Sequence, residues 1–239
     1  MFEPLTWDSQ FFNRRIGAMK GPWIPAAVSA DVNEARAHGY DYLTARPPVD
    51  DAAAVRALEQ AGFYLTDIGV TWSSSIDQYS RGPANATGSS RAATEADLPW
   101  LRDAAATLFV QSRFYHDPFY STAAANRMHS AWIENSVRGV AADAVWVLDE
   151  TGFVTCKVDG RGTGHIVLIG VVDGAQGRGA GRMLMTAALR WFTERKVREV
   201  MVKTQVKNMK AMNFYRSLGF ALRGADVTFG CRLTEAEAE

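Results

Sequence analysis

The chain has 239 residues, 47% of them hydrophobic, which is enough to bury one or two sizeable cores. Lys plus Arg and Asp plus Glu both number 26, so the chain lacks the basic field that attracts nucleic acid. The cysteines, Cys156 and Cys231, are too few for a disulfide framework and too far apart for a Cys-x-x-Cys site. With neither a secretory pattern nor an apolar run of about 20 residues, we expect a cytoplasmic protein with no nucleic-acid, membrane or metal partner.

The first predicted elements form a strand–helix–strand unit that recurs later in the chain. The first copy has a strand at 40–44, a helix at 52–61 and then Gly62-Phe63, with Val70 further on. The second copy has a strand at 199–203, a helix at 208–218 and then Gly219-Phe220, with Val227 further on. Gly62 and Gly219 are 157 positions apart, and so are Val70 and Val227. Because two copies are modest evidence for a repeat, chance similarity of two βαβ units stays open.

Turn-forming residues cluster between the two copies. Residues 79–91 read Tyr-Ser-Arg-Gly-Pro-Ala-Asn-Ala-Thr-Gly-Ser-Ser-Arg and show no apolar periodicity. We therefore predict a linker at 79–91, which separates an N-terminal domain of residues 1–78 from a second domain of residues 92–239.

The second part carries a longer series of elements. Thr94 is predicted to begin a helix with Leu98, Leu101 and Leu108 on its apolar face. The elements predicted after it are a helix at 123–137, strands at 144–148, 153–158 and 165–172, and an amphipathic helix at 181–195. This order predicts a mixed α/β (α+β) fold.

Glycines follow the last of these strands, in the run Gln176-Gly177-Arg178-Gly179-Ala180-Gly181. Glycines let the backbone turn its N–H groups toward an anion at the positive end of the next helix, which favours a phosphate or pyrophosphate. The run lacks the Gly-Lys-Ser/Thr of a P-loop, and its Gly-x-Gly-x-Gly spacing differs from that of dinucleotide-binding folds. By itself it is also compatible with a turn that binds nothing.

Two motifs in this order resemble the GNAT acetyltransferases. Gln176-x-x-Gly179-x-Gly181 is similar to the family's pyrophosphate-binding motif, and Asn208-x-x-Ala211-x-x-Phe214-Tyr215-x-x-x-Gly219-Phe220 resembles a second signature downstream. The resemblance implies a GNAT fold with a mixed, mostly antiparallel central sheet, preceded by a smaller, degenerate GNAT-like half. It also implies acetyl-CoA as co-substrate. The residues implied to hold it are Gln176, Gly177, Arg178, Gly179, Ala180, Gly181, Arg182 and Asn208.

The resemblance further implies which groups carry the chemistry. Backbone amides of a splayed strand stabilise the oxyanion of acetyl transfer in this family. Here they are expected at Ile169, Gly170, Val171 and Val172. A glycine in such a strand is alternatively a β-bulge without a catalytic role.

Proton transfer has two candidate residues. Tyr215 falls on the family position of the general acid that protonates the departing thiolate, and a tyrosine with an ordinary pKa near ~10 is protonated at neutral pH. His165 begins the strand where some family members carry a glutamate base, and histidine titrates in the useful range. A water chain is the alternative base.

Segments outside these motifs resemble the branch of the family that acetylates nucleotide-linked amino sugars of the dTDP-4-amino-4,6-dideoxyhexose type. They are residues 5–8, 11–12, 109–114 and 132–139. Such an acceptor needs a cation for phosphate, aromatic rings for stacking and polar groups for hydroxyls. The predicted substrate residues are Gln111, Arg113, Asp117, Tyr120, Trp132 and Asn135, with Arg127 as an alternative to Arg113.

Other functions stay open at this stage. The acceptor is alternatively another small amine, such as an amino acid or an antibiotic. A non-catalytic CoA-binding module is the alternative of a different class, which the intact Tyr215 and glycine run disfavour. Exposed strand edges leave a homodimer open as well.

Overall fold

The computed structural model describes residues 1–78 and 90–234, so most of the predicted linker lies outside the described residues. The chain divides into two compact units. Unit 1 contains residues 1–69, 111–124 and 225–234, and unit 2 contains residues 70–78, 90–110 and 125–224. Both units are discontinuous along the chain, and the predicted division into residues 1–78 and 92–239 stays a prediction.

Unit 1 consists of short strands covered by helices. Its elements are β1 (Phe2–Pro4), α1 (Thr6–Phe12), β2 (Ile16–Met19), α2 (Pro25–Ala37), β3 (Tyr42–Ala45), α3 (Ala52–Gln60) and η3 (Arg113–Tyr115). β1 pairs antiparallel with β2, β2 parallel with β3, and β3 antiparallel with the end of β10 (Ala221–Arg232). Val28 and Val32 on α2 and Leu58 on α3 are buried in one cluster with Leu43 of β3. Their spacing of four residues on α2 places both valines on the face turned to the sheet.

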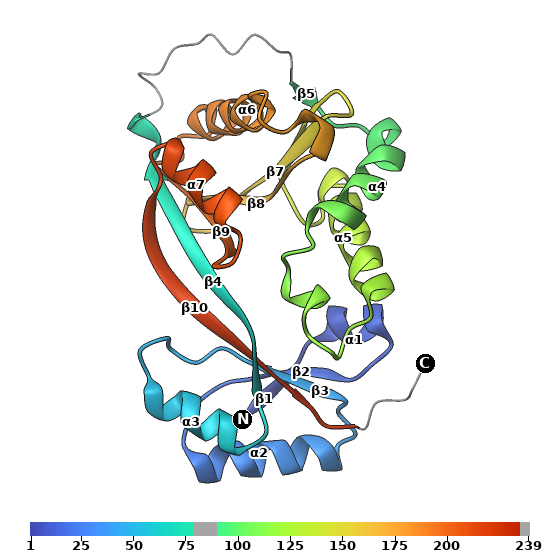
Figure 1. Cartoon of the computed structure of the whole chain (residues 1–239), viewed down its shortest axis with the longest axis vertical. Coiled ribbons are helices and arrows are strands. Elements are labelled where there is room, and N and C mark those ends of the chain that lie inside the picture. Colours follow the sequence, from blue (N-terminus) through green and yellow to red (C-terminus); the bar gives the residue numbers. More distant parts are fainter. Residues whose placement is uncertain (79–89, 235–239) are drawn as a thin grey trace. The chain divides into compact units, whose positions relative to one another are not determined.

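Unit 2 contains the rest of the sheet, with helices on both faces. Its elements are β5 (Arg91–Ala92), η2 (Glu95–Asp97), α4 (Leu98–Leu108), β6 (Ala144–Leu148), β7 (Gly152–Val158), β8 (Gly164–Val171), η4 (Asp173–Ala175), α6 (Ala180–Glu194), β9 (Glu199–Gln205) and α7 (Met209–Ser217). Most of α5 (Thr122–Val137) belongs to it, and so do η1 (Ile76–Gln78) and the end of β4 (Tyr64–Ser75). The strands follow the order β4-β9-β8-β7-β6-β5. Figure 1 labels all of these strands except β6.

Two apolar layers enclose this part of the sheet. On one face, Leu184, Met185 and Phe192 of α6 pack with Val154 of β7 and Val200 of β9. On the other face, residues of α4 and α5 pack with the strands. That second cluster contains Leu101, Ala105, Ile133, Val145, Val147, Phe153 and Leu168. The fold is therefore a mixed sheet between helices, as predicted for the second part.

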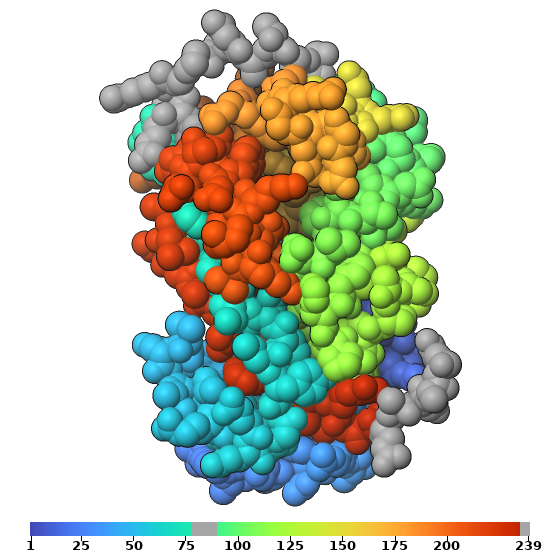
Figure 2. Space-filling model, in the orientation of Figure 1, coloured from blue at the N-terminus to red at the C-terminus, as the bar shows by residue number. Residues whose placement is uncertain are grey.

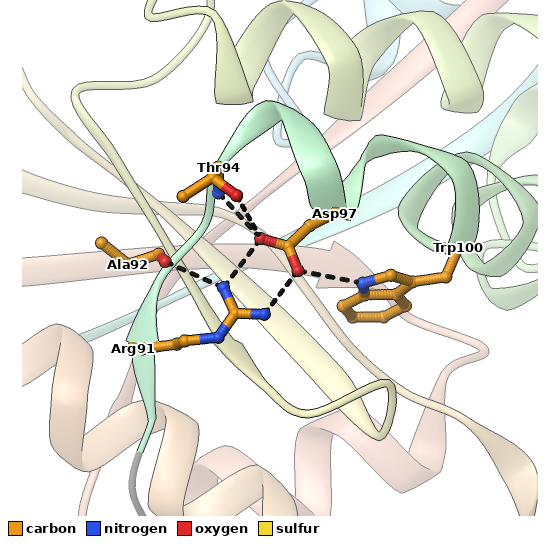
Figure 3. Close-up of polar contacts among 5 residues, drawn as sticks. All are labelled: Arg91, Ala92, Thr94, Asp97 and Trp100. Atoms are coloured by element: carbon orange, nitrogen blue, oxygen red, sulfur yellow. Dashed lines mark hydrogen bonds and ion pairs between the residues drawn. The ribbon is translucent and has the colours of Figure 1, made fainter.

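A network of polar contacts marks the beginning of α4 (Figure 3). The Asp97 carboxylate accepts two hydrogen bonds from the Arg91 guanidinium, at 2.8 and 2.6 Å. It also accepts one from the Thr94 amide at 2.8 Å and one from the Trp100 indole at 3.4 Å. Asp97 is 5% exposed, so these donors satisfy a nearly buried charge. Thr94 precedes the turn η2, and α4 follows directly.

The predicted strand–helix–strand repeat is present as β3-α3-β4 and β9-α7-β10. Each helix is followed, after its C-cap residue, by a glycine with positive φ, +88° at Gly62 and +82° at Gly219. This conformation favours glycine after a helix C-terminus. The following phenylalanines, Phe63 and Phe220, are 4% and 3% exposed and enter the cores of their units. Both copies therefore use the same local turn.

Candidate active site

Strand β8 changes its pairing halfway along. On the β7 side, Thr155 is opposite Leu168 and Cys156 is opposite Ile166, which leaves Val167 as an extra residue. The Thr155 hydroxyl accepts a hydrogen bond from the Leu168 amide at 2.8 Å. Ile166 packs on the α6 face and Leu168 on the α4 face, although two residues apart normally share a face. Val167 is therefore a β-bulge.

The bulge coincides with the separation of β8 from β9. The two strands pair in parallel only at residues 164–166 of β8, although β9 continues to Gln205. The Leu168 amide donates toward β7, and the Val172 amide donates to the Thr151 carbonyl at 2.9 Å. Because N–H groups alternate along a strand, the amides of Ile169 and Val171 face away from β7. Of the four predicted oxyanion donors, these two are directed toward the separated side of β8.

Gly170 is explained by packing against α4. A Cβ at this position would lie 2.8 Å from Leu108 Cδ1, with Phe109 and Phe153 at 3.6 Å. The glycine thus allows the end of α4 to approach the strand beyond the bulge. The shape of β8 at the candidate site therefore depends on α4 as well as on the strand itself.

The glycine loop follows β8 and leads into α6. Gly177 and Gly179 have φ of +76° and +89°, and a Cβ on either would meet nothing within 4 Å. The Met183 amide donates to the Gly179 carbonyl, so the amides of residues 180–182 have no partner within the helix. No side chain among the described residues caps this end of α6. With Arg178 and Arg182 exposed beside it, this helix end is suited to an anion.

The Gln176 side chain makes three hydrogen bonds at the start of this loop. Its amide nitrogen donates to the Val171 carbonyl and to the Asp173 carboxylate, both at 2.9 Å. Its amide oxygen accepts from Lys210 of α7 at 2.8 Å. Lys210 was not among the sequence candidates, because nothing in a one-dimensional pattern brings position 210 next to position 176. The side chain of Gln176 therefore positions the loop.

Helix α7 lies beside the N-terminus of α6. A Cβ on Gly181 would lie 3.2 Å from the Phe214 ring, and the surfaces of the two helices adjoin in Figure 2. Asn208 caps α7, since its side-chain oxygen accepts from the Ala211 amide at 3.1 Å. Tyr215 is 4% exposed, and burial raises the pKa of its phenol above the ordinary value. The hydroxyl therefore keeps its proton at neutral pH.

His165 lies on β8 before the bulge. Its Nε2 is 2.9 Å from the Asp159 carboxylate, and its side chain is 37% exposed. His165 and Ile169 are four residues apart, which corresponds to about 13 Å along a strand. The histidine side chain closes the turn between β7 and β8. The structure does not bring it next to Ile169 or Val171.

The predicted substrate residues are divided between the units. Gln111, Arg113, Asp117 and Tyr120 belong to unit 1, whereas Trp132 and Asn135 are half-buried on α5 in unit 2. Trp132 packs edge-on against His129, with ring centroids 5.4 Å apart.

Asp117 is bound by neighbouring groups of unit 1. It is 2% exposed and accepts hydrogen bonds from the Tyr42 and Tyr64 hydroxyls and from the Phe119 amide. Burial, together with the Asp117 charge, raises the pKa of both tyrosines, which keeps them neutral donors. The sequence carried no signal for this pairing, because Tyr42 and Tyr64 are distant from Asp117 along the chain.

Among the described residues, no helix is long and apolar enough to cross a membrane. Within the same residues, no three His, Cys, Asp or Glu side chains are grouped closely enough to hold a metal ion.

The mixed sheet, with a glycine loop between β8 and α6, agrees with the fold that the resemblance implied. The model of the acetyltransferase (GNAT) family matches residues 103–220. The chain belongs to the GNAT acetyltransferase family and is an acyltransferase, and the family uses acetyl-CoA.

The similarity extends beyond the family domain. The chain is 30% identical over 228 residues to dTDP-fucosamine acetyltransferase from Escherichia coli O6:H1, covering 91% of this chain and 92% of that protein. A mycothiol acetyltransferase from Saccharopolyspora erythraea is 37% identical over 79 residues, which are 33% of this chain and 26% of that protein.

A solved GCN5-related N-acetyltransferase from Sphaerobacter thermophilus has the same fold. It superposes with a TM-score of 0.64 at 15% identity, covering 98% of this chain and 77% of that one. At this identity the likeness concerns the fold alone.

Proposed function

We propose that the protein transfers the acetyl group of acetyl-CoA to the amine of a nucleotide-linked amino sugar of the dTDP-4-amino-4,6-dideoxyhexose type. The observation that carries this proposal is the similarity to dTDP-fucosamine acetyltransferase, which extends over 91% of the chain. A match limited to the acetyl-CoA motifs would suggest no acceptor, because those motifs are shared by members with different amines.

Binding of acetyl-CoA is assigned to the glycine loop and α6. The amides of residues 180–182, which have no partner within the helix, are proposed to bind the pyrophosphate, with Gly177 and Gly179 shaping the approach. Arg178 and Arg182 add positive charge at the same helix end. Asn208 supports this arrangement by capping α7, the helix that carries Tyr215.

The reaction is proposed to proceed by direct attack of the amine on the acetyl carbonyl. Acetyl-CoA supplies an acyl group activated by its thioester. The amides of Ile169 and Val171 donate hydrogen bonds to the carbonyl oxygen as negative charge develops on it. Tyr215, protonated because burial raises its pKa, donates its proton to the departing thiolate sulfur.

The base that takes the proton from the amine is either His165 or a water chain. An altered acid limb in the pH–rate profile of His165→Ala supports the histidine. An unshifted profile eliminates it and leaves water as the base.

A thiol-release assay with a panel of amines tests the acceptor. The panel holds dTDP-4-amino-4,6-dideoxygalactose, a free amino sugar, an amino acid and an aminoglycoside, each with acetyl-CoA. We expect the nucleotide sugar to give the highest kcat/KM and a product heavier by one acetyl group. Faster turnover of another amine would refute the nucleotide-sugar acceptor, and thiol release with none of them would favour a binding module.

A further inference from the structure

Arg113 of unit 1 is an arginine that forms no ion pair with a carboxylate among the described residues. Arg113 forms no ion pair within 4.0 Å, and its Nη1 is buried without a hydrogen-bond partner among the described residues. The Tyr120 hydroxyl is also buried without a well-formed hydrogen bond among these residues, and it interacts electrostatically with the Arg113 guanidinium. Buried donors without acceptors are rare in native proteins, because leaving one unpaired costs free energy.

The guanidinium is held in a defined position by aromatic rings. Its carbon lies 4.2 Å from the centroid of the Phe114 ring and 5.8 Å from that of Tyr120. Phe12 packs on both rings, with centroids 6.1 and 4.8 Å away. Arg113 is half-buried, so part of the residue still reaches the surface. A guanidinium held in one orientation, with a buried donor that lacks an acceptor, is suited to bidentate binding of an oxyanion.

The surrounding charges leave this guanidinium available. Asp117 influences Arg113 electrostatically, but its oxygens accept from Tyr42, Tyr64 and the Phe119 amide. Asp8 interacts electrostatically with Arg113 and with the exposed Arg46, but it forms no ion pair with Arg113 within 4.0 Å. Burial raises the pKa of the Asp8 carboxyl group.

We propose that Arg113 and Tyr120 form an anion subsite of unit 1 that holds a phosphate group of the acceptor. Phosphate oxygens accept hydrogen bonds and carry charge, so one group satisfies both buried donors and neutralises the guanidinium. Asp117 acts as a positioning residue, because it holds the turn that joins Arg113 to Tyr120. The alternative cation Arg127 is exposed on α5 and has no comparable setting.

The choice of ligand, a nucleoside diphosphate, rests on the proposed function. Binding of this ligand to the subsite can be measured without turnover. Calorimetry and thermal shift with dTDP, and separately with inorganic pyrophosphate, are carried out on the full chain. We expect Arg113→Gln to weaken dTDP binding by at least about tenfold. Arg113→Lys should weaken it by less, because lysine keeps the positive charge but cannot donate two parallel hydrogen bonds as a guanidinium does. The matched control is Arg56→Gln, which removes an exposed charge from α3 and is expected to bind as the wild type does.

Tyr120→Phe separates ligand binding from a structural role. The Tyr120 hydroxyl interacts with the Arg113 guanidinium but has no well-formed hydrogen bond among the described residues, so its removal is expected to change Tm little. In the subsite, the same change raises the KM for the acceptor about threefold or more, while the KM for acetyl-CoA stays constant. A merely structural hydroxyl would leave both KM values unchanged.

The outcomes distinguish the subsite from the proposed function. If the acceptor is another amine but pyrophosphate binds in an Arg113-dependent way, the subsite stands and the nucleotide-sugar function fails. If the nucleotide sugar is acetylated but Arg113→Gln keeps the wild-type affinity, the function stands and the subsite is overturned. Equal losses in Arg113→Gln and Arg56→Gln also overturn it, since binding then follows net charge alone.

Discussion

Tyr215 is a buried phenol whose protonation state decides whether it acts as an acid. Burial raises its pKa, so the hydroxyl keeps its proton at neutral pH and into the alkaline range. We predict that Tyr215→Phe lowers kcat by more than about tenfold, because a positioned acid contributes about 10²–10⁴-fold. The KM for acetyl-CoA should change by less than about twofold. Steady-state thiol release measures both constants, and an unchanged kcat would remove the assignment.

Asp97 is the residue whose titration has the clearest consequence for stability. Hydrogen bonds from Arg91 hold its pKa well below the usual value near ~4. A depressed pKa in the folded state stabilises the fold fully above the unfolded pKa, and the stabilisation is lost as pH falls through the folded pKa. We predict that Asp97→Asn lowers the free energy of unfolding at pH 7 by about 1–3 kcal/mol.

Urea unfolding as a function of pH checks this prediction. The difference between wild type and Asp97→Asn should stay constant from pH 7 to about pH 4 and shrink below that. Arg91 is half exposed, so solvent screening keeps the effect toward the lower end. A difference that grows as the pH falls would contradict the assigned sign.

At the scale of elements, the conformation of the loop before α6 depends on glycine. Gly179 has φ of +89°, where a side chain is strained, while a Cβ there would meet no atom within 4 Å. An alanine at this position therefore acts through the backbone, at a cost of about 1–2 kcal/mol. We predict that Gly179→Ala raises the KM for acetyl-CoA about tenfold, because about 1.4 kcal/mol corresponds to a factor of ten.

Gly174 supplies the matched control for that variant. It lies in η4 of the same connection, and a Cβ there also meets nothing within 4 Å, but its φ is not in the positive region. Gly174→Ala should therefore leave the KM for acetyl-CoA near the wild-type value. Equal effects of the two substitutions would show that loop composition, and not the backbone of Gly179, determines binding.

Sequence patterns predicted the elements of the site better than the irregularity within them. The strand at 144–148 was predicted with its observed bounds, and α5 begins one residue before its predicted start. The bulge at Val167 was not predicted, because Ile166 to Val172 is a nearly continuous apolar run in which a change of face leaves no trace. The contact of Lys210 with Gln176 was missed because it joins residues 34 positions apart.

For the whole molecule, the internal repeat was visible in sequence but the compact units were not. Repeated helix-Gly-Phe turns are local and follow from residue type. The strands after them, β4 and β10, each begin in one unit and end in the other. The pairing of a β-strand depends on residues that are distant in sequence. The change in composition near residues 79–91 therefore does not indicate that residues 111–124 and 225–234 belong to unit 1.

Both copies of the strand–helix–strand unit raise the question of how many acetyl-CoA molecules one chain binds. Before α6, Gly177 and Gly179 leave the helix amides uncapped. Before α3, Pro47 and Pro48 lack amide hydrogens, and the Asp51 carboxylate already accepts from the Ala54 amide at 2.9 Å. A carboxylate at that helix end repels a pyrophosphate.

We therefore predict that calorimetric titration of the full chain with acetyl-CoA gives one site per chain. Gly179→Ala should weaken that single site about tenfold without revealing a second one. The Asp51→Ser variant tests the reason directly, because serine still caps α3 but removes the negative charge. One site in this variant as well shows that the missing glycines suffice to prevent binding at α3. Two sites in the wild type would contradict the prediction and give the N-terminal copy a binding role of its own.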